Sequence, residues 1–324
     1  MRKLPTRNVA TLSRVLSMWV ILTLCLGSTV VSSAIDQPVH IKKNVLYKTT
    51  PQGDLLIDIY YPEKTLKGEY PVMIYTHGGG WAAGSKSKAW SAKIGQVNQG
   101  LVKQGFCVVA VQYRLWKSGG ATAMRDCVID AKDAIRFLAK NRKTLHVNTD
   151  QVFTFGDSAG GQIAQILLLS SPESLPGDEA LKGSTYQVVA GLSWYGPCDF
   201  EKTGLFNHDD RKNFRDRFGA RILYPDTKPE DKLAMYREMS PINYLKKESP
   251  PLLMIQGDSD TTIPVKHAYY MKKRAKELGA PVDTMIIKHA GHNWRKADGK
   301  TPIEPGVNVI VKKSIDFIVG HIPN

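Results

Sequence analysis

Cysteine is scarce in this chain, which has four cysteines among 324 residues. Cys25 lies in the N-terminal apolar segment, which leaves Cys107, Cys127 and Cys198 for the rest of the chain. Three cysteines can form at most one disulfide, so a disulfide-stapled scaffold is excluded. Cys107 stands in the apolar run 106–111, where a buried, unreactive thiol is expected.

Acidic residues are also few, since 30 Asp and Glu stand against 44 Lys and Arg, for a formal net charge of +14. The basic residues are spread along the chain and form no cluster, so the sequence gives no support to nucleic-acid binding. Internal repeats, low-complexity runs and a second-domain linker are missing. With 42% hydrophobic residues, the chain can bury a large core, and one α/β domain is expected.

Long apolar runs occur once, near the N-terminus. Arg2, Lys3, Arg7 and Arg14 precede the apolar run 15–31, and Ser32-Ser33-Ala34 follows. This order is typical of a secretory signal peptide, so we expect cleavage after Ala34 and a mature domain at 35–324. The protein would then be secreted or periplasmic, without stable membrane insertion after cleavage. The alternative is a membrane anchor formed by the uncleaved segment.

The mature chain alternates between strand-like and helix-like patterns. Stretches 45–49 and 55–60 flank a Pro-Gln-Gly-Asp turn and predict an antiparallel hairpin. The alternation predicts an α/β fold: a mostly parallel, twisted sheet of about eight strands with helices on both faces. Further strands are expected at 71–76, 106–113, 152–155, 188–195, 251–256 and 283–287, and helices at 88–103, 121–140, 162–169, 265–278 and 310–318.

The pattern breaks between Gly196 and Leu245, in a segment rich in charged and aromatic residues. A long insertion between two core strands is usually functional. We expect 196–245 to be a lid that shapes the substrate site, with a plain surface excursion as the alternative.

The stretch 152–169 predicts a strand, a sharp turn and a helix in direct succession. Its turn is Gly156-Asp157-Ser158-Ala159-Gly160, a Gly-x-Ser-x-Gly pattern. In such a turn the serine takes a strained backbone conformation that lifts its hydroxyl above the sheet edge. Ser158 is therefore a candidate nucleophile.

Three other motifs follow the ends of predicted strands, where α/β folds bind ligands. They are His77-Gly78-Gly79-Gly80-Trp81, Asp258-Ser259-Asp260 and Gly291-His292. A serine nucleophile needs a base, an acid that orients the base, and hydrogen-bond donors for the oxyanion. The chain order Ser, Asp, His is that of α/β-hydrolases.

With these motifs the chain, from about residue 45 to 320, resembles the α/β-hydrolase superfamily. Within it, the resemblance is to esterases and lipases with a His-Gly-Gly-Gly loop, near hormone-sensitive-lipase-like and bacterial carbohydrate-esterase members. The resemblance implies Ser158 as nucleophile, Asp260 as acid and His292 as base. The oxyanion hole that it implies is made by the backbone N–H groups of Gly79, Gly80 and Ala159.

Two residues compete with the implied acid and base. The family places the acid four residues before a proline, which selects Asp260 over Asp258; His292 is preferred to His289 because it follows a glycine in a loop. The loop before the acid begins Gln-Gly where the family often has His-Gly. A metal held by His289 and His292 would lack a third ligand at a helpful spacing, so we expect no metal and no cofactor.

The function expected from these features is that of a secreted serine esterase that hydrolyses short acyl esters through an acyl-enzyme. The partner is an ester substrate, and a carbohydrate ester of the acetyl xylan or feruloyl type is preferred, because a basic surface suits acidic glycans. The alternatives are a general short-chain carboxylesterase or lipase, a peptidase, an aryl-formamidase or an inactive binding protein. Four aromatic residues near the motifs are expected to contact substrate: Trp81, Trp194, Tyr195 and Trp294.

Overall fold

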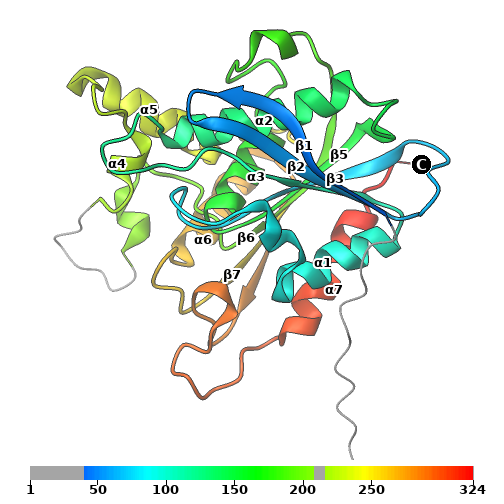
Figure 1. The fold of residues 1–324 in the computed structure, drawn as a ribbon. Coiled ribbons are helices and arrows are strands. Elements are labelled where there is room, and N and C mark those ends of the chain that lie inside the picture. The colour runs from blue at the N-terminus through cyan, green and yellow to red at the C-terminus, as the bar shows by residue number, and fades with distance from the viewer. Residues whose placement is uncertain (1–39, 208–215, 324) are drawn as a thin grey trace, which may run out of the picture. The chain divides into compact units, whose positions relative to one another are not determined.

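The computed structural model describes residues 40–207 and 216–323. Within them, eight strands form one sheet in the order β1-β2-β4-β3-β5-β6-β7-β8 (Figure 1). β1 pairs with β2, and β2 with β4, in antiparallel fashion, whereas the other neighbours are parallel. The strands are β1 (His40–Thr50), β2 (Gly53–Tyr61), β3 (Tyr70–Thr76), β4 (Cys107–Val111), β5 (Val147–Asp157), β6 (Val188–Trp194), β7 (Leu252–Gly257) and β8 (Val282–Ile287).

This topology confirms the predicted α/β-hydrolase fold, including the hairpin, which joins β1 to β2. The predicted helix 88–103 is divided into a 3-10 helix, Lys86–Trp90, and α1 (Ala92–Lys103). Ala92 has a φ of 44°, a left-handed conformation through which a helix cannot continue. The predicted signal peptide, 1–34, lies outside the described residues, so this prediction remains open.

Helices cover both faces of the sheet (Figure 1). Alternate residues of β3 enter different cores, because side chains of a strand point to opposite faces. Val72 and Ile74 pack in the core with α2 (Met124–Lys140) and α3 (Ala159–Leu169), whereas Met73 and Tyr75 pack on the side of α1 and α7 (Val307–Val319). Another long helix, α6 (Lys266–Leu278), lies between β7 and β8 in the chain.

Local signals explain where some of these helices begin and end. The carboxylate of Asp126 accepts a hydrogen bond of 2.8 Å from the backbone N–H of Ala123, which caps the start of α2 three residues later than expected. α6 ends at Gly279, whose φ of 73° is left-handed.

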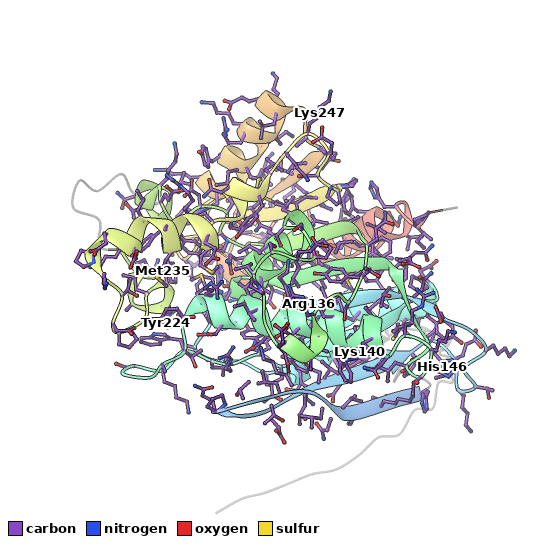
Figure 2. All side chains as sticks on the ribbon, turned by 90° about the horizontal axis from the view of Figure 1, so that it is seen from above. Arg136, Lys140, His146, Tyr224, Met235 and Lys247 are labelled. Carbon is purple, nitrogen blue, oxygen red and sulfur yellow. The ribbon has the colours of Figure 1, made fainter. Side chains whose placement is uncertain are left out.

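The insertion 196–245 packs on the same core as α2 and α3. Its described part contains the short helix α4 (Gly219–Ile222) and α5 (Lys232–Met239). Phe218, Ile222 and Met239 are buried in the core that also holds residues of α2 and α3. Figure 2 labels Met235 on α5, in the part of the chain that packs against this core.

The three cysteines among the described residues are buried and form no disulfide. Burial raises the pKa of Cys107, Cys127 and Cys198, so each thiol stays protonated. Over residues 40–207 and 216–323, no helix is both long and apolar enough to cross a membrane.

Candidate active site

Ser158 lies in a sharp turn between β5 and α3, as the sequence predicts. Its φ of 53° and ψ of −119° are strained for a residue other than glycine, and its N–H donates to the carbonyl of Trp194 over 2.8 Å. The backbone of the turn packs closely against β3: a Cβ atom on Gly160 would lie 2.0 Å from the carbonyl oxygen of Thr76. Only glycine fits there, and the strain places Ser158 at the start of α3.

The structure brings Ser158, His292 and Asp260 together from three separate loops. Nε2 of His292 lies 3.0 Å from Oγ of Ser158, and Nδ1 of His292 lies 2.7 Å from Oδ2 of Asp260. Both distances are within hydrogen-bond reach. A hydroxyl, an imidazole and a carboxylate in this sequence form the relay that activates a serine.

Asp260 is buried and held by several hydrogen bonds. Its side chain is fully buried, and its Oδ1 accepts from the N–H groups of Thr262 and Ile263 at 2.8 and 3.0 Å. The amide of Gln256 donates to Oδ2 over 3.1 Å. Asp258 is exposed, where it accepts from the hydroxyl of Ser259. The structure therefore places Asp260, and not Asp258, beside the imidazole.

The side chain of His292 is 16% exposed and faces Ser158, whereas His289 is exposed on the surface. The rings of Tyr195 and His292 meet edge to face with centroids 4.8 Å apart, and Trp294 packs against Tyr195 at 4.7 Å. Tyr195 thus restricts the orientation of the imidazole. In the described residues, no group of three His, Cys, Asp or Glu could hold a metal ion.

The His-Gly-Gly-Gly loop lies beside the serine turn. The N–H of Gly78 donates to Oδ1 of Asp157 over 2.9 Å, and Lys88 pairs with Oδ2 of the same carboxylate at 2.6 Å. Asp157, the residue before the serine, therefore ties the loop to the turn. Within the described chain, the N–H groups of Gly79 and Gly80 have no hydrogen-bond acceptor, so both are available to a ligand.

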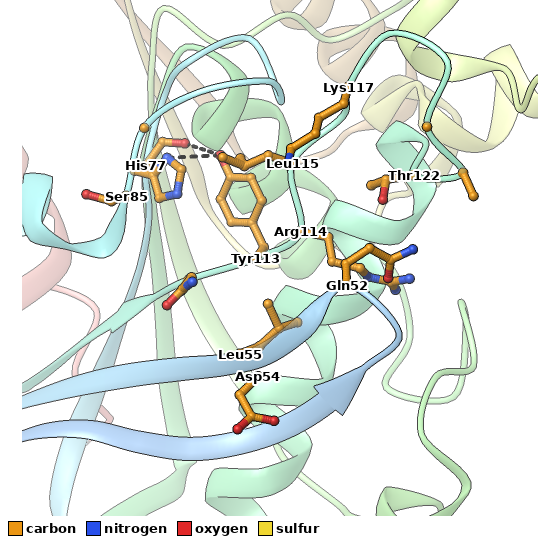
Figure 3. Close-up of a pocket in the computed structure, with 14 residues that line it drawn as sticks. Gln52, Asp54, Leu55, His77, Ser85, Tyr113, Arg114, Leu115, Lys117 and Thr122 are labelled. Atoms are coloured by element: carbon orange, nitrogen blue, oxygen red, sulfur yellow. Dashed lines mark hydrogen bonds between the residues drawn. The ribbon is translucent and has the colours of Figure 1, made fainter.

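His77 stabilises the loop from behind. Its ring is buried and stacks on Tyr113, with centroids 4.3 Å apart, and the hydroxyl of Tyr113 donates to the carbonyl of His77. Burial lowers the pKa of His77 to about 4, so the ring is neutral at neutral pH. Figure 3 shows His77 and Tyr113 beside a cavity of about 310 Å³. Ser158 does not line this cavity.

A cavity of about 340 Å³ opens over the serine. Ser158 and His292 line it together with Gly79, Gly80 and Trp81 of the glycine loop. The acid loop and the insertion contribute Thr262, Ile263, Arg217, Phe218 and Arg221. The ion pair of Lys88 and Asp157 also lines the cavity, as does Asn293.

Of the four aromatic residues expected to contact substrate, Trp81 alone lines this cavity. Trp194 was misplaced by sequence reasoning: it is fully buried under the sheet, where its indole N–H donates to Ser314 on α7. Tyr195 and Trp294 are 4% and 3% exposed and lie behind His292. For Trp194, the last residue of β6, strand alternation explains the outcome, because a residue at a strand end can point to the core as well as to the site.

Arg217 and Arg221 are cavity residues that sequence reasoning did not single out. They come from the insertion, where charged residues are frequent and no motif marks these two. Their guanidinium groups contact the loops that carry the site. Arg221 donates to the carbonyl of Gly80 over 2.9 Å, and Arg217 to the carbonyls of Thr261 and Thr262 at 3.1 and 3.3 Å.

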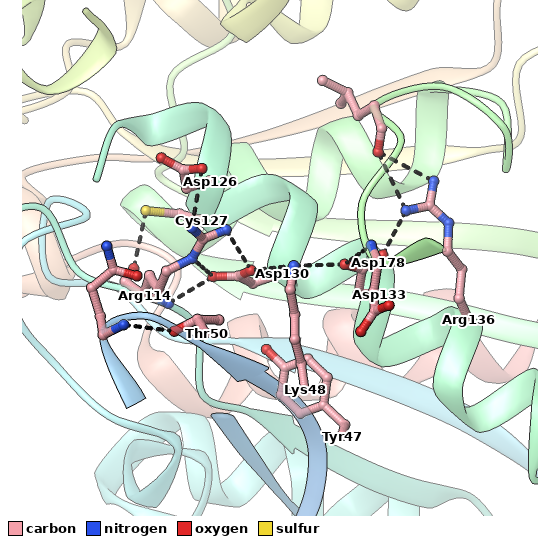
Figure 4. Close-up of polar contacts among 12 residues, drawn as sticks. Tyr47, Lys48, Thr50, Arg114, Asp126, Cys127, Asp130, Asp133, Arg136 and Asp178 are labelled. Atoms are coloured by element: carbon pink, nitrogen blue, oxygen red, sulfur yellow. Dashed lines mark hydrogen bonds and ion pairs between the residues drawn. The ribbon is translucent and has the colours of Figure 1, made fainter. Parts of the chain in front are cut away.

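A second set of charges lies inside the fold, along α2 (Figure 4). Asp130 pairs with Arg114 at 2.7 Å and with Lys48 at 2.8 Å. Asp133 pairs with Lys48 at 2.7 Å and with Arg136 at 2.8 Å. Both carboxylates are fully buried, so the cations and anions of this network, which we call the α2 network, compensate one another.

Comparison with known proteins identifies relatives of this chain. The model of the BD-FAE family matches residues 57–275. The chain is 26% identical over 267 residues to esterase LipC of Mycobacterium tuberculosis, which covers 80% of this chain and 61% of LipC. It is 23% identical over 254 residues to isoprenylcysteine alpha-carbonyl methylesterase ICME of Arabidopsis thaliana. This match covers 78% of this chain and 56% of ICME. The chain thus spans 56–61% of the length of these two relatives.

Solved structures with the same fold include two esterases. A truncated form of carbohydrate esterase from gut microbiota has a TM-score of 0.69 at 23% identity, over 89% of this chain and 98% of its own. Esterase 2 of Thermogutta terrifontis, with propionate bound, has a TM-score of 0.67 at 21% identity, over 88% of this chain and 96% of its own. At these identities the similarity establishes a shared fold.

Proposed function

The chain belongs to the BD-FAE family, and from this premise we propose that it is a serine carboxylic ester hydrolase that acts on short acyl esters. The observation that carries the proposal is the continuous hydrogen-bonded path from Ser158 through His292 to Asp260. Relatives that are named esterases, such as LipC, agree with it.

The proposed reaction follows from the positions of these groups. Oγ of Ser158 attacks the ester carbonyl carbon while its proton passes to Nε2 of His292, and the carbonyl oxygen becomes an oxyanion. His292 then gives the proton to the departing alcohol, which leaves an acyl-serine. A water molecule, deprotonated by His292, attacks the acyl carbon, and the acid is released as Ser158 regains its proton.

The oxyanion would be stabilised by the N–H groups of Gly79, Gly80 and Ala159. Gly79 and Gly80 line the cavity, and Ala159 begins α3, where the N–H groups of the first turn have no intrahelical acceptor. The helix dipole also favours negative charge at this end. Each such donor typically lowers the barrier by about 3–4 kcal/mol.

The cavity supports a short acyl group. Its volume of about 340 Å³ is near the lower end of the range of about 300–1,000 Å³ found for small-molecule sites. Trp81, Phe218 and Ile263 supply its apolar wall. Among aliphatic acyl groups we propose a preference for acetate to butyrate, and long-chain lipids are disfavoured.

We further propose a carbohydrate ester, of the acetyl xylan or feruloyl type, as the natural substrate. The basic charge of the chain supports an acidic glycan as the alcohol part. A fold neighbour is named a carbohydrate esterase, which is in keeping with this proposal. None of the four expected aromatic residues offers an open face for stacking on a sugar, because Trp81 is 1% exposed and the other three do not line the cavity.

Labelling with a fluorophosphonate probe tests the proposed nucleophile. We expect the wild-type protein to be labelled and Ser158→Ala not to be; labelling of Ser158→Ala would refute the assignment. The exposed Ser259→Ala is the matched control and should be labelled like the wild type.

Hydrolysis of a substrate panel tests the acyl and alcohol parts. We expect kcat/KM for 4-nitrophenyl esters to fall from butyrate to longer chains, and acid to be released from acetylated xylan or feruloylated oligosaccharide. Release of acid from tributyrin emulsions alone would indicate a lipase instead.

Export is a separate proposal, supported by the order of basic, apolar and small residues in 1–34. Mass spectrometry of the exported protein should find an N-terminus at Ile35. Material that retains residues 1–34 would favour the membrane anchor.

A further inference from the structure

The cavity over Ser158 carries two cations whose charge nothing in the described chain neutralises. Arg217 and Arg221 both line it, and in residues 40–207 and 216–323 neither forms an ion pair with a carboxylate. Each uses Nη1 for backbone carbonyls, Arg221 for Gly80 and Arg217 for Thr261 and Thr262. Nε and Nη2 of both guanidinium groups have no acceptor in this part of the chain.

The carboxylates around the cavity are occupied by other groups. Asp157 is paired with Lys88, and Asp260 is hydrogen-bonded to His292 and fully buried. Asp216, next to Arg217 in sequence, accepts from the hydroxyl of Tyr236 and from two backbone N–H groups. Within residues 40–207 and 216–323, neither arginine is therefore paired with a carboxylate.

Arg221 is partly removed from solvent, whereas Arg217 is exposed. The guanidinium carbon of Arg221 lies 5.7 Å from the ring centres of both Trp116 and Phe218, which favours the cation but leaves its open N–H groups without an acceptor among the described residues. Burial, followed by the charge of Arg217, lowers the pKa of Arg221. An anion that enters the cavity would remove this unfavourable interaction, and a guanidinium binds a carboxylate through two parallel hydrogen bonds.

We propose that the cavity selects esters that carry a carboxylate close to the scissile bond, bound by Arg217 and Arg221. This inference rests on the proposed esterase function and specifies its substrate class. Arg221 contacts Gly80 and Arg217 contacts the loop after Asp260, so the carboxylate would be held between the glycine loop and the acid loop. It can belong to the acyl part, as in a dicarboxylic monoester, or to the alcohol part, as in a uronate.

Matched pairs of esters test the selection. For the acyl arm, mono-(4-nitrophenyl) succinate is compared with its neutral methyl ester; for the alcohol arm, 4-acetoxybenzoate is compared with methyl 4-acetoxybenzoate. The anionic preference is the ratio of kcat/KM within a pair. Dividing the wild-type preference by that of a variant cancels the intrinsic reactivity of the esters.

We expect Arg217→Gln with Arg221→Gln to lower the anionic preference about tenfold or more in one arm, because a hydrogen bond to a charged group contributes about 1.5–3 kcal/mol. Arg221→Lys, which keeps the charge, should retain more of the preference than Arg221→Gln. The control is Arg237→Gln, an arginine of the same insertion that pairs with Glu201 at 2.9 Å and does not line the cavity. It should leave the preference unchanged.

An unchanged preference in both arms, in a variant that circular dichroism shows to be folded, would overturn the inference. If the double variant fails to fold, the anionic preference is measured on the single variant Arg217→Gln, whose substitution is at an exposed residue. Calorimetry of benzoate and benzamide binding to Ser158→Ala separates this inference from the proposed function, since it needs no turnover. Tighter binding of benzoate that is lost in the Arg217→Gln background supports the anion site even if no ester is hydrolysed, and equal binding contradicts it.

Discussion

The α2 network and the cavity over Ser158 both contain arginine residues, but the partners of their guanidinium groups differ. In the α2 network, Arg114 and Arg136 are paired with buried carboxylates at 2.7 and 2.8 Å. In the cavity, Arg217 and Arg221 have backbone carbonyls as partners and no carboxylate in the described chain. The first arrangement is complete without a ligand, whereas the second leaves hydrogen-bond donors open.

This difference predicts that the α2 network contributes mainly to stability and the cavity arginines mainly to function. A buried ion pair that loses one partner leaves an uncompensated charge, which destabilises the fold. An open cation at a cavity contributes little to folding, but it can bind a ligand of opposite charge. We therefore expect substitutions at the site to change catalysis, and substitutions in the α2 network to change stability.

The largest effect is expected at the proposed nucleophile and the proposed base. Ser158→Ala and His292→Ala should each lower kcat about 10⁴-fold or more while the protein stays folded, because the remaining groups cannot activate a nucleophile. Steady-state kinetics with circular dichroism measures both properties. His289→Ala, at the exposed histidine, serves as the control; near-wild-type turnover in His292→Ala would show that the base is misassigned.

A loss of about 10³–10⁴-fold in kcat is expected for Asp260→Asn, because the amide cannot hold the same imidazole tautomer. Its buried acceptor Oδ1 can still bind the N–H groups of Thr262 and Ile263, so the loop should keep its shape. Asp258→Asn should retain full activity. Equal losses in both variants would contradict the assigned acid.

The α2 network is broken by Asp133→Asn, which removes the charge that faces both Lys48 and Arg136. We expect a loss of about 3–5 kcal/mol in the free energy of unfolding, measured with urea. The kcat of the folded fraction should stay near the wild-type value. Asp150→Asn, at an exposed ion pair, should cost less than about 1 kcal/mol. A similarly small loss in Asp133→Asn would contradict the structural role of the network.

The smallest effect, counted per pH unit, is expected at Lys132 on α2. Its ammonium is buried and donates to Ser170, Ser171 and Ser174. Burial, followed by the charge of Arg136, lowers the pKa of Lys132 to about 7. The folded protein then binds fewer protons than the unfolded chain between pH of about 7 and 10.4, so Lys132 makes stability rise with pH across this window.

Urea unfolding at several pH values from 6 to 10 measures this contribution as the difference between wild type and Lys132→Met. The difference should shift in favour of the wild type as the pH rises, by at most about 1.4 kcal/mol per pH unit. Lys272→Met, at an exposed residue of α6, should show no such trend. A pH-independent difference for Lys132→Met would mean that its pKa is not lowered.

Much of the fold was predictable because its signals are local. Period-two alternation and short apolar runs indicated the strands, and the Gly-x-Ser-x-Gly turn after a strand predicted where Ser158 would stand. The break in the helix at Ala92 was not predictable, because its left-handed φ has no marker in the sequence. The wrong placement of Trp194 has a similar cause, since its side chain reaches Ser314 on α7, 120 residues further along the chain.

The sequence by itself determined the order of the elements, the strained turn at Ser158, and a short set of acids and bases that could serve it. These properties depend on residues that are neighbours along the chain. The sequence already favoured Asp260 over Asp258 and His292 over His289. Only the tertiary structure shows that Asp260 and His292 lie beside Ser158, whereas Asp258 and His289 face solvent. It also decided that Arg217 and Arg221 line the cavity, because the path of the insertion over the sheet edge is set by long-range packing against α2, α3 and the glycine loop.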